Sequence, residues 1–230
     1  MITTNVIQRT FQLRFGGGTG TCFTVDHKGR QYLVTAKHCI EGLADGDTIE
    51  LFRDDEWKRM PVSLVGHGQG DVDISVVAPP QQLSPVHPLP ATTAHMVYGQ
   101  DVFFLGFPFG LASHSKDLNG GFPFPLVKKA TLSAIDFGPN AVMLLDGLNN
   151  PGFSGGPVVF TKPGSAKLDY SVAAVISAYR FNRVSVDHGR LPTPLTVNEN
   201  TGIIIAYSIN HAVTLIENNP IGFSLPETQA

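Results

Sequence analysis

Short apolar segments rich in β-branched residues recur along the chain, each bounded by Gly, Pro, Asn or Asp. This pattern is typical of a protein with many short strands joined by turns, and a long helical period is almost absent. The strand candidates are Cys22–Val25, Tyr32–Ala36, Thr48–Phe52, Val62–Val65, Ile74–Ala78, Val102–Phe107, Val127–Phe137, Val142–Asp146, Pro157–Thr161, Ser171–Tyr179 and Gly202–Ile209. We therefore expect an all-β fold. The exception is the end of the chain, where Asn210 is placed to cap a helix from His211 to about Asn218.

The most proline-rich stretch, Pro79–Pro90, divides the strand candidates into two groups. Proline fixes φ and removes a backbone donor, so this stretch is predicted to be a connector between residues 1–90 and residues 91–230. Two further segments, Leu111–Leu126 and Arg180–Thr201, are predicted to be long irregular loops.

Charge and hydropathy exclude several classes of partner. Charged residues make up only 15% of the chain, the net charge is −3, and Lys128–Lys129 is the longest basic run. A clustered basic face is therefore not expected, and neither is nucleic-acid binding. No stretch of about 18 apolar residues occurs, so no membrane span is expected. Met1–Phe15 lacks the apolar centre of a secretory signal, which predicts a cytoplasmic protein, with a trimmed secreted or periplasmic form as the alternative.

The chain has two cysteines, Cys22 and Cys39. Two are too few for a disulfide scaffold or a zinc site, so no metal is expected. The pair could form one bridge or remain as small buried apolar side chains.

A glycine-rich segment around Ser154 has the composition of a tight turn with an exposed hydroxyl. The backbone N–H groups of Gly152 and Ser154 could then point into one space and stabilise a developing oxyanion. A glycine-rich hairpin without function has the same composition. The strand-to-helix elbow of α/β-hydrolases does not fit, because Pro157–Phe160 is a proline followed by a β-type run.

A histidine and two candidate carboxylates lie in the first half of the chain. His38 directly follows the strand candidate that ends at Ala36. A carboxylate that orients its imidazole could come from Asp71 or Asp73, just before an apolar β-type run. The two aspartates are two positions apart, so in an extended strand their side chains would point to the same face, and periodicity alone does not separate them.

The segments Thr35–Cys39 and Gly152–Pro157 together resemble the two signatures of trypsin-like serine proteases, Thr-Ala-x-His-Cys and Gly-x-Ser-Gly-Gly-Pro. The resemblance implies a chymotrypsin-like double barrel, with two six-stranded antiparallel Greek-key barrels and a short C-terminal helix. It also implies a catalytic triad of His38, Asp73 and Ser154, because Asp73 matches the family pattern. Their order along the chain is that of the chymotrypsin-like group.

Within that family the chain is most similar to bacterial Deg-type (HtrA-like) proteases. The matching segments are Gly18–Phe23, Leu105–Leu111, Asn150–Gly152 and Gly202–Asn210. The chain ends soon after the expected helix, so no peptide-binding PDZ domain is expected. Cys22 and Cys39 match a pair that digestive-type relatives bridge, which is less typical of the Deg branch.

The same resemblance implies residues that bind a protein or peptide substrate without a cofactor. They are Leu148 at the base of the S1 pocket, Ser177, Ala178 and Tyr179 on the substrate-pairing strand, and Gly202 on the opposite wall. A leucine at the pocket base predicts a small or medium apolar P1 side chain rather than Lys or Arg. The alternatives are a non-catalytic peptide-binding module on the same fold, an esterase, and a polyprotein-type protease of narrow specificity.

Overall fold

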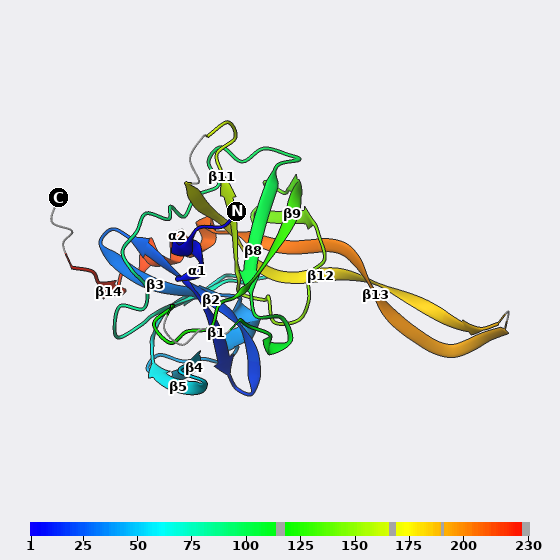
Figure 1. The fold of residues 1–230 in the computed structure, drawn as a ribbon, viewed down its shortest axis with the longest axis horizontal. Helices are drawn as coiled ribbons and strands as arrows, with labels where there is room; N and C mark the ends of the chain where they lie inside the picture. The colour runs from blue at the N-terminus through cyan, green and yellow to red at the C-terminus, as the bar shows by residue number, and fades with distance from the viewer. Residues whose placement is uncertain (114–117, 166–168, 190, 227–230) are drawn as a thin grey trace.

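The computed structural model describes residues 1–113, 118–165, 169–189 and 191–226. Its strands form two antiparallel sheets, which confirms the expected all-β double-barrel fold (Figure 1). Within these residues the first sheet has eight strands in the order β5-β4-β1-β2-β3-β7-β6, with β14 beside β3. Its strands are β1 (Thr10–Phe15), β2 (Gly18–His27), β3 (Arg30–Thr35), β4 (Thr48–Arg53), β5 (Glu56–Pro61), β6 (Ser63–His67), β7 (Ser75–Ala78) and β14 (Phe223–Ser224).

The second sheet closes into a barrel in the order β10-β13-β12-β11-β8-β9. Its strands are β8 (Asp101–Gly106), β9 (Leu126–Ile135), β10 (Val142–Asp146), β11 (Pro157–Thr161), β12 (Tyr170–His188) and β13 (Leu191–Ser208). The short helical segments are α1 (Thr4–Ile7), η1 (Lys37–Ile40), η2 (Pro108–Gly110) and α2 (Asn210–Asn218). Among the described residues the second sheet thus has the six strands expected, whereas the first has eight rather than six.

The first sheet curls strongly, although its ends are not paired with each other. β5 and β6 lie at opposite ends of the strand order, yet a single residue, Val62, joins them along the chain. The amide of Val62 donates to the carbonyl oxygen of Asp47 over 2.9 Å. A short link between the two ends of a sheet requires the sheet to bend round on itself. The result is a half-barrel whose concave side holds a core that includes Phe11, Leu33 and Ile49.

The two sheets share one apolar core where they meet. Val34 and Val76 of the first sheet belong to the same buried cluster as Leu105 and Val175 of the second, and Ile216 of α2 completes it. A separate cluster fills the interior of the closed barrel. Because burial of apolar surface is the main stabilising term, this shared core fixes the relative position of the two halves and of any site between them.

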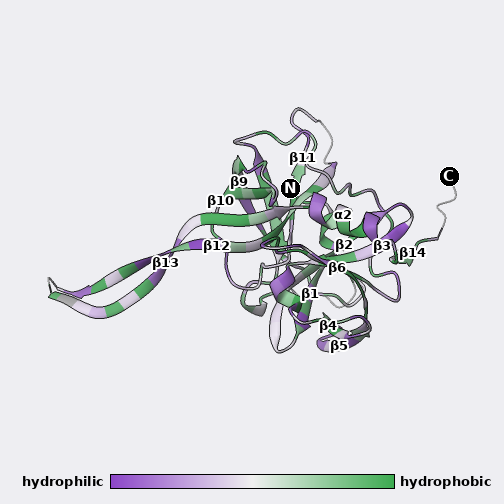
Figure 2. Cartoon of the chain, turned by 180° about the vertical axis from the view of Figure 1, so that it is seen from behind, coloured by the Kyte–Doolittle hydropathy of each residue, from purple (hydrophilic) through white to green (hydrophobic). Residues whose placement is uncertain are grey.

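The segment Arg180–Thr201 is not an irregular loop, as the sequence predicted, but the outer part of a long β-hairpin formed by β12 and β13. Figures 1 and 2 show this hairpin extending away from both sheets. Most of its side chains are exposed on both faces, so no burial pattern marks it in the sequence. The prolines Pro192 and Pro194 lie near its far end in β13.

The other elements agree with the sequence in part. Helix α2 is present as expected, but Asn210 is its first residue and Ile209 occupies the cap position without a capping side chain. Strands β1 and β5 were not predicted. In β5 only Met60 is buried, so its sequence reads as polar. Helices long and apolar enough to cross a membrane are not found in the described part of the chain.

Candidate active site

His38 lies in η1, directly after β3, and one carboxylate holds its imidazole. The ring N–H at Nδ1 donates to Asp73 Oδ2 over 2.7 Å, and the backbone N–H of His38 donates to Asp73 Oδ1 over 2.9 Å. The other candidate, Asp71, is exposed and is not a hydrogen-bond partner of His38 in the described structure. Asp73 is therefore the carboxylate that orients this imidazole.

The contact between these side chains changes the pKa of both. The hydrogen bond with Asp73 raises the pKa of His38 to about 10, with a second contribution from the Cys39 side chain and an opposing one from burial. Burial is the largest influence on Asp73 and raises its pKa, but hydrogen bonds from His38 and Ser177 outweigh it and lower the pKa overall. At neutral pH the pair is therefore an imidazolium beside a carboxylate.

Ser154 lies in the turn before β11, and its neighbours fix that turn. Phe153 is fully buried and packs edge-on against Phe104 with 4.8 Å between ring centroids. Gly155 has a φ of +84°, and a Cβ there would lie 2.0 Å from the carbonyl oxygen of Thr21. Only glycine fits both the conformation and the space. The turn can therefore pack directly on the first sheet.

The Ser154 turn meets the first sheet beside His38. The carbonyl oxygen of Ser154 accepts hydrogen bonds from the amide of Thr21 over 2.8 Å and from the thiol of Cys39 over 3.6 Å. The hydroxyl of Ser154 donates to the carbonyl oxygen of Ser177 over 3.0 Å, and not to the imidazole of His38. The fold thus brings Ser154 against the residue that follows His38, with its hydroxyl directed at β12.

The backbone around Ser154 directs two N–H groups away from the protein's own acceptors. The carbonyl oxygen of Pro151 accepts from the amide of Phe109 over 2.9 Å, and that of Phe153 accepts from the amide of Gly156 over 2.8 Å. In a trans peptide the N–H points opposite to the carbonyl. The N–H groups of Gly152 and Ser154 are therefore turned away from these partners, and within the described residues neither donates to another group. This is the arrangement expected of an oxyanion hole.

Ser177 connects the two halves of the site. Its hydroxyl donates to Asp73 Oδ2 over 2.5 Å, while its carbonyl oxygen accepts from Ser154. Ala178 and Tyr179 follow on β12, the first exposed and the second half-buried. Ser177 therefore contacts both the carboxylate on the first sheet and the serine on the second, a bridging role that the sequence did not reveal.

The segment before Ser154 is tied to the base of the long hairpin. Asn149 donates to the carbonyl oxygen of Ala178 over 3.3 Å, and its own carbonyl oxygen accepts from Asn200 over 2.7 Å. Gly202 is joined to the same segment, because its carbonyl oxygen accepts from the amide of Gly147 over 2.8 Å. Leu148, at 52% exposure, is thus held beside β12 and Gly202, and its place at the base of an S1 pocket stays a prediction.

Lys128 was not predicted to take part in this region. Its ammonium group donates to the carbonyl oxygen of Leu148 and, over 3.2 Å, to Asn150 Oδ1. It lies 5.7 Å from the centroid of the Phe153 ring, and burial lowers its pKa. Such contacts join residues far apart in the chain and leave no local pattern that a sequence could show.

The two cysteines are free in the structure. Cys22 is buried, and its thiol is directed at the carbonyl oxygen of Phe11, whereas Cys39 is directed at Ser154. The sequence left open whether Cys22 and Cys39 form a disulfide, and in the structure they do not. In the described part of the chain, no group of three or more His, Cys, Asp or Glu side chains is arranged to hold a metal ion.

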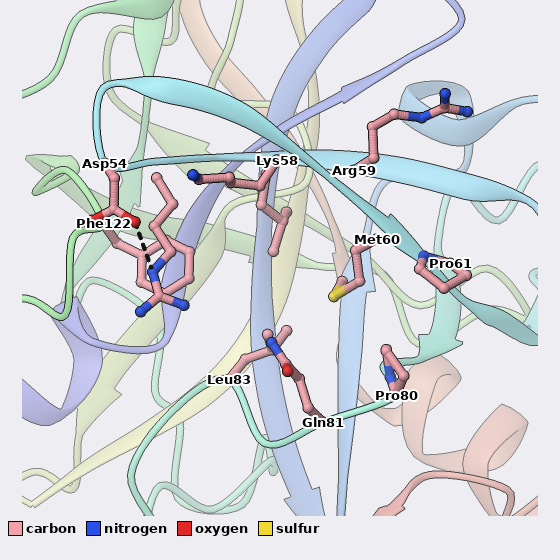
Figure 3. A pocket seen from close by; sticks show the side chains of 11 residues that line it. Asp54, Lys58, Arg59, Met60, Pro61, Pro80, Gln81, Leu83 and Phe122 are labelled. Carbon is pink, nitrogen blue, oxygen red and sulfur yellow. Dashed lines mark ion pairs between the residues drawn. The ribbon is translucent and has the colours of Figure 1, made fainter.

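Two hollows are bordered by His38, and a larger one lies elsewhere. One of about 380 Å³ is bordered by His38, Asp73 and Gly68, and another of about 350 Å³ by His38, Cys39 and Thr19. A hollow of about 500 Å³ lies against β4 and β5 (Figure 3). The triad candidates do not border it. Its lining residues include Lys58, Arg59, Met60, Leu83 and Phe122.

A half-barrel joined to a closed barrel, with a His–Asp pair on the first and a glycine-flanked serine turn on the second, defines the chymotrypsin-like double-barrel class. The chain belongs to the trypsin-like peptidase domain family, whose model matches residues 18–164. A similar curated protein is Protease Do-like 1, chloroplastic, of Arabidopsis thaliana, which is 31% identical over 143 residues. That match covers 62% of this chain and 30% of the relative, so the chain spans about a third of the relative's length.

Solved structures show the same fold at low sequence identity. The Rv3671c protease of M. tuberculosis, in its inactive form, is 16% identical with a TM-score of 0.57 over 93% of this chain and 90% of its own. The serine endoprotease from Yersinia pestis is 20% identical with a TM-score of 0.58 over 93% of this chain and 63% of its own. These likenesses concern the fold alone.

Proposed function

We propose that the protein is a serine endopeptidase in which His38, Asp73 and Ser154 form the catalytic triad. The observation that carries the proposal is the pair of hydrogen bonds between His38 and Asp73, located where the Ser154 turn meets the first sheet. The unengaged amides of Gly152 and Ser154 support it further, because an acyl-transfer enzyme needs donors for the oxyanion.

In the proposed reaction, the hydroxyl of Ser154 turns from Ser177 to the Nε2 atom of a neutral His38. Without substrate, the Ser154 hydroxyl donates to the carbonyl oxygen of Ser177. A substrate N–H that donates to the same oxygen would displace the hydroxyl and so favour this rotation. The proton passes to His38 as Oγ bonds to the substrate carbonyl carbon, and the amides of Gly152 and Ser154 hold the oxyanion. His38 then protonates the leaving amine, and water releases the acyl group in the same way.

Asp73 keeps its charge throughout and stabilises the imidazolium that forms. The hydrogen bond from Ser177 supports this role, since it also favours the ionised carboxyl. Ser177 is a positioning residue in this scheme, because its hydroxyl acts on Asp73 and not on the substrate.

The proposed P1 preference is a small or medium apolar side chain. Leu148 offers no charge to a basic side chain, and the nearby ammonium of Lys128 disfavours Lys or Arg further. Tyr179 is half-buried on the same strand as Ser177, and its ring would reduce the space available to a P1 side chain. Selection among apolar residues should be modest, because one methylene group is worth about 1–3 kcal/mol.

The function is tested by comparing cleavage of casein and of a peptide library with turnover of p-nitrophenyl esters. We expect peptide-bond cleavage that requires Ser154, at several sites that share an apolar P1. Turnover of esters without peptides would indicate an esterase, and cleavage at one narrow motif would indicate a polyprotein-type protease. Well-folded protein that binds peptides but cleaves neither substrate class would contradict the proposal in favour of a binding module.

A further inference from the structure

Strand β12 has a long free edge that starts at the candidate active site. On one side it pairs with β13 out to the pair His188–Leu191, while on the other it pairs with β11 only between Tyr170 and Val175. Beyond Val175, within the residues that the structure describes, no strand pairs with this second edge. The hairpin then extends into open space (Figures 1 and 2).

The beginning of this free edge coincides with the residues assigned to the substrate. The carbonyl oxygen of Ser177 accepts from the Ser154 hydroxyl, and that of Ala178 accepts from the Asn149 side chain. On this second edge β11 ends its pairing at Val175, before both residues. From Tyr179 onward the backbone continues as β-strand without an intervening loop. A peptide paired with Ser177–Tyr179 would therefore meet an uninterrupted strand edge on the N-terminal side of its scissile bond.

We propose that Arg180–His188 forms a docking edge on which the non-prime part of the substrate adds as an antiparallel strand. The occupant is an extended, unfolded polypeptide segment, since a folded chain has already used these backbone groups. At about 3.3 Å per residue the edge is about 30 Å long, enough for a substrate segment well beyond the P3 position. Strand addition of this kind takes its affinity from main-chain hydrogen bonds and its selectivity from alternate side chains. This inference rests on the proposed function.

The hairpin carries features that favour a flexible peptide over a second copy of itself. The β12–β13 register shifts between Tyr179 and Phe181 and again between Ser185 and Asp187. Such bulges twist a strand and, together with exposed charges such as Arg183, hinder pairing between two preformed edges. An unfolded segment can follow the twist, whereas an identical rigid hairpin would have to match both bulges at once.

The β12–β13 hairpin also has exposed apolar side chains that a bound strand could contact. Val184 and Val197 are directly opposite each other across β12 and β13, so their side chains share one face. They are 36% and 53% exposed, respectively. A substrate strand beside β12 would place every second side chain on this face, where β-branched or other apolar residues would gain contact. The class of substrate is thus an extended segment with apolar residues at alternate positions.

The test uses peptides that share one scissile bond and grow on its N-terminal side from three residues to ten. In the unmodified protein we expect kcat/KM to rise at least about tenfold with length, as several backbone hydrogen bonds are added. The matched variant replaces residues 182–199 by Asn-Gly, which can close the hairpin because Phe181 and Asn200 are paired. It should cleave the three-residue peptide normally and show no gain with length.

A second measurement needs only the unmodified protein. Single N-methyl groups, placed in turn along the ten-residue peptide, remove one backbone donor at a time. Strand pairing predicts losses at every second position, because alternate N–H groups of a strand face its neighbour. Equal cleavage of short and long peptides would overturn the docking edge and leave the proposed function intact. An undiminished length effect in the shortened variant, or a dimer that the shortening abolishes, would also overturn it. Failure to cleave any peptide would overturn the proposed function as well.

Discussion

The hydroxyl of Thr21, on the first sheet, donates a hydrogen bond over 2.7 Å to the carbonyl oxygen of Gly152, in the turn that precedes β11 of the second sheet. The same hydroxyl accepts from the amide of Phe107 over 3.2 Å. Together with the bond from Phe109 to Pro151, this contact fixes both peptide groups that flank Gly152. The candidate oxyanion hole on the second barrel therefore depends on a side chain of the first.

Replacing Thr21 with valine keeps the shape and removes the hydroxyl. A buried acceptor left without its donor costs about 1–3 kcal/mol, so we expect kcat/KM to fall by about 10- to 100-fold if the peptide at Gly152 loses its orientation. Steady-state kinetics on a peptide substrate will measure this. Thr48→Val, on β4 at a distance from the site, is the control and should leave the rate unchanged. Equal rates for both variants would refute the role given to Thr21.

Gly152→Ala should disable the oxyanion hole more completely. Gly152 has a φ of +103°, and a Cβ there would lie 2.4 Å from the carbonyl oxygen of Phe107. The peptide must move, and loss of one oxyanion donor costs on the order of 10²–10³ in kcat. Gly18→Ala serves as the control, because its new Cβ would meet only an ordinary contact at 3.5 Å. Full activity in Gly152→Ala would exclude this amide from catalysis.

The pH dependence of the reaction should reflect the raised pKa of His38. The general base must be neutral, and Asp73 followed by Cys39 raises that pKa from 6.5 to about 10. We therefore expect kcat/KM to keep rising with pH above neutrality, toward pH 10. Asp73→Asn removes the largest cause, so the rise should shift to lower pH while kcat drops by about 10⁴. A pH–rate profile of both proteins gives the comparison, and an unshifted profile would contradict it.

The same shift has a consequence for stability. A histidine whose pKa is raised on folding contributes stability that is fully present below its unfolded pKa, here 6.5, and is lost as the pH rises to about 10. The thermal midpoint of the unmodified protein should decrease over this window, and that of Asp73→Asn should decrease less. A parallel decrease in the two proteins would place the origin of the pH effect elsewhere.

Arg9 is expected to hold the proline-rich connector in place. This arginine is 1% exposed and donates to Asp26 Oδ2 over 2.6 Å and to the carbonyl oxygen of His87 over 2.6 Å. Breaking a buried ion pair by removing one partner costs about 3–5 kcal/mol, so Arg9→Met should lower the free energy of unfolding by that amount. Denaturant titration measures the change. Arg53→Met, at a more exposed ion pair, should cost less than about 1 kcal/mol.

Local patterns predicted the fold class, whereas the set of His38, Asp73 and Ser154 came from the resemblance of two segments to the signatures of trypsin-like serine proteases. Strand-length apolar runs between turn residues predict an all-β protein, and the segments around His38 and Ser154 have compositions that their turns require. Periodicity did not separate Asp73 from Asp71, so the choice of Asp73 came from the family pattern, and in the structure Asp73 is the one that meets the imidazole. Thr21, Lys128 and Asn149 were missed because they act through contacts distant in the chain.

The β12–β13 hairpin was missed for a different reason. Burial produces the alternation that identifies a strand, and the outer half of this hairpin is exposed on both faces. Its prolines, Pro192 and Pro194, also counted against a strand. β5 shows the same limit, since only Met60 among its residues is buried. Strands whose side chains are mostly exposed lack the alternation of apolar and polar residues by which a strand is recognised in a sequence.

The most direct measurement is labelling of the protein with a fluorophosphonate, followed by mass spectrometry of the modified peptide. If His38 and Asp73 activate a nucleophile, one label per chain should appear on Ser154, and Ser154→Ala should lose both the label and about 10⁶ in kcat while keeping its fold. Exposed Ser133 provides a comparison that should remain unlabelled. An unlabelled Ser154 in folded protein, or a Ser154→Ala variant that still cleaves peptides, would contradict the account.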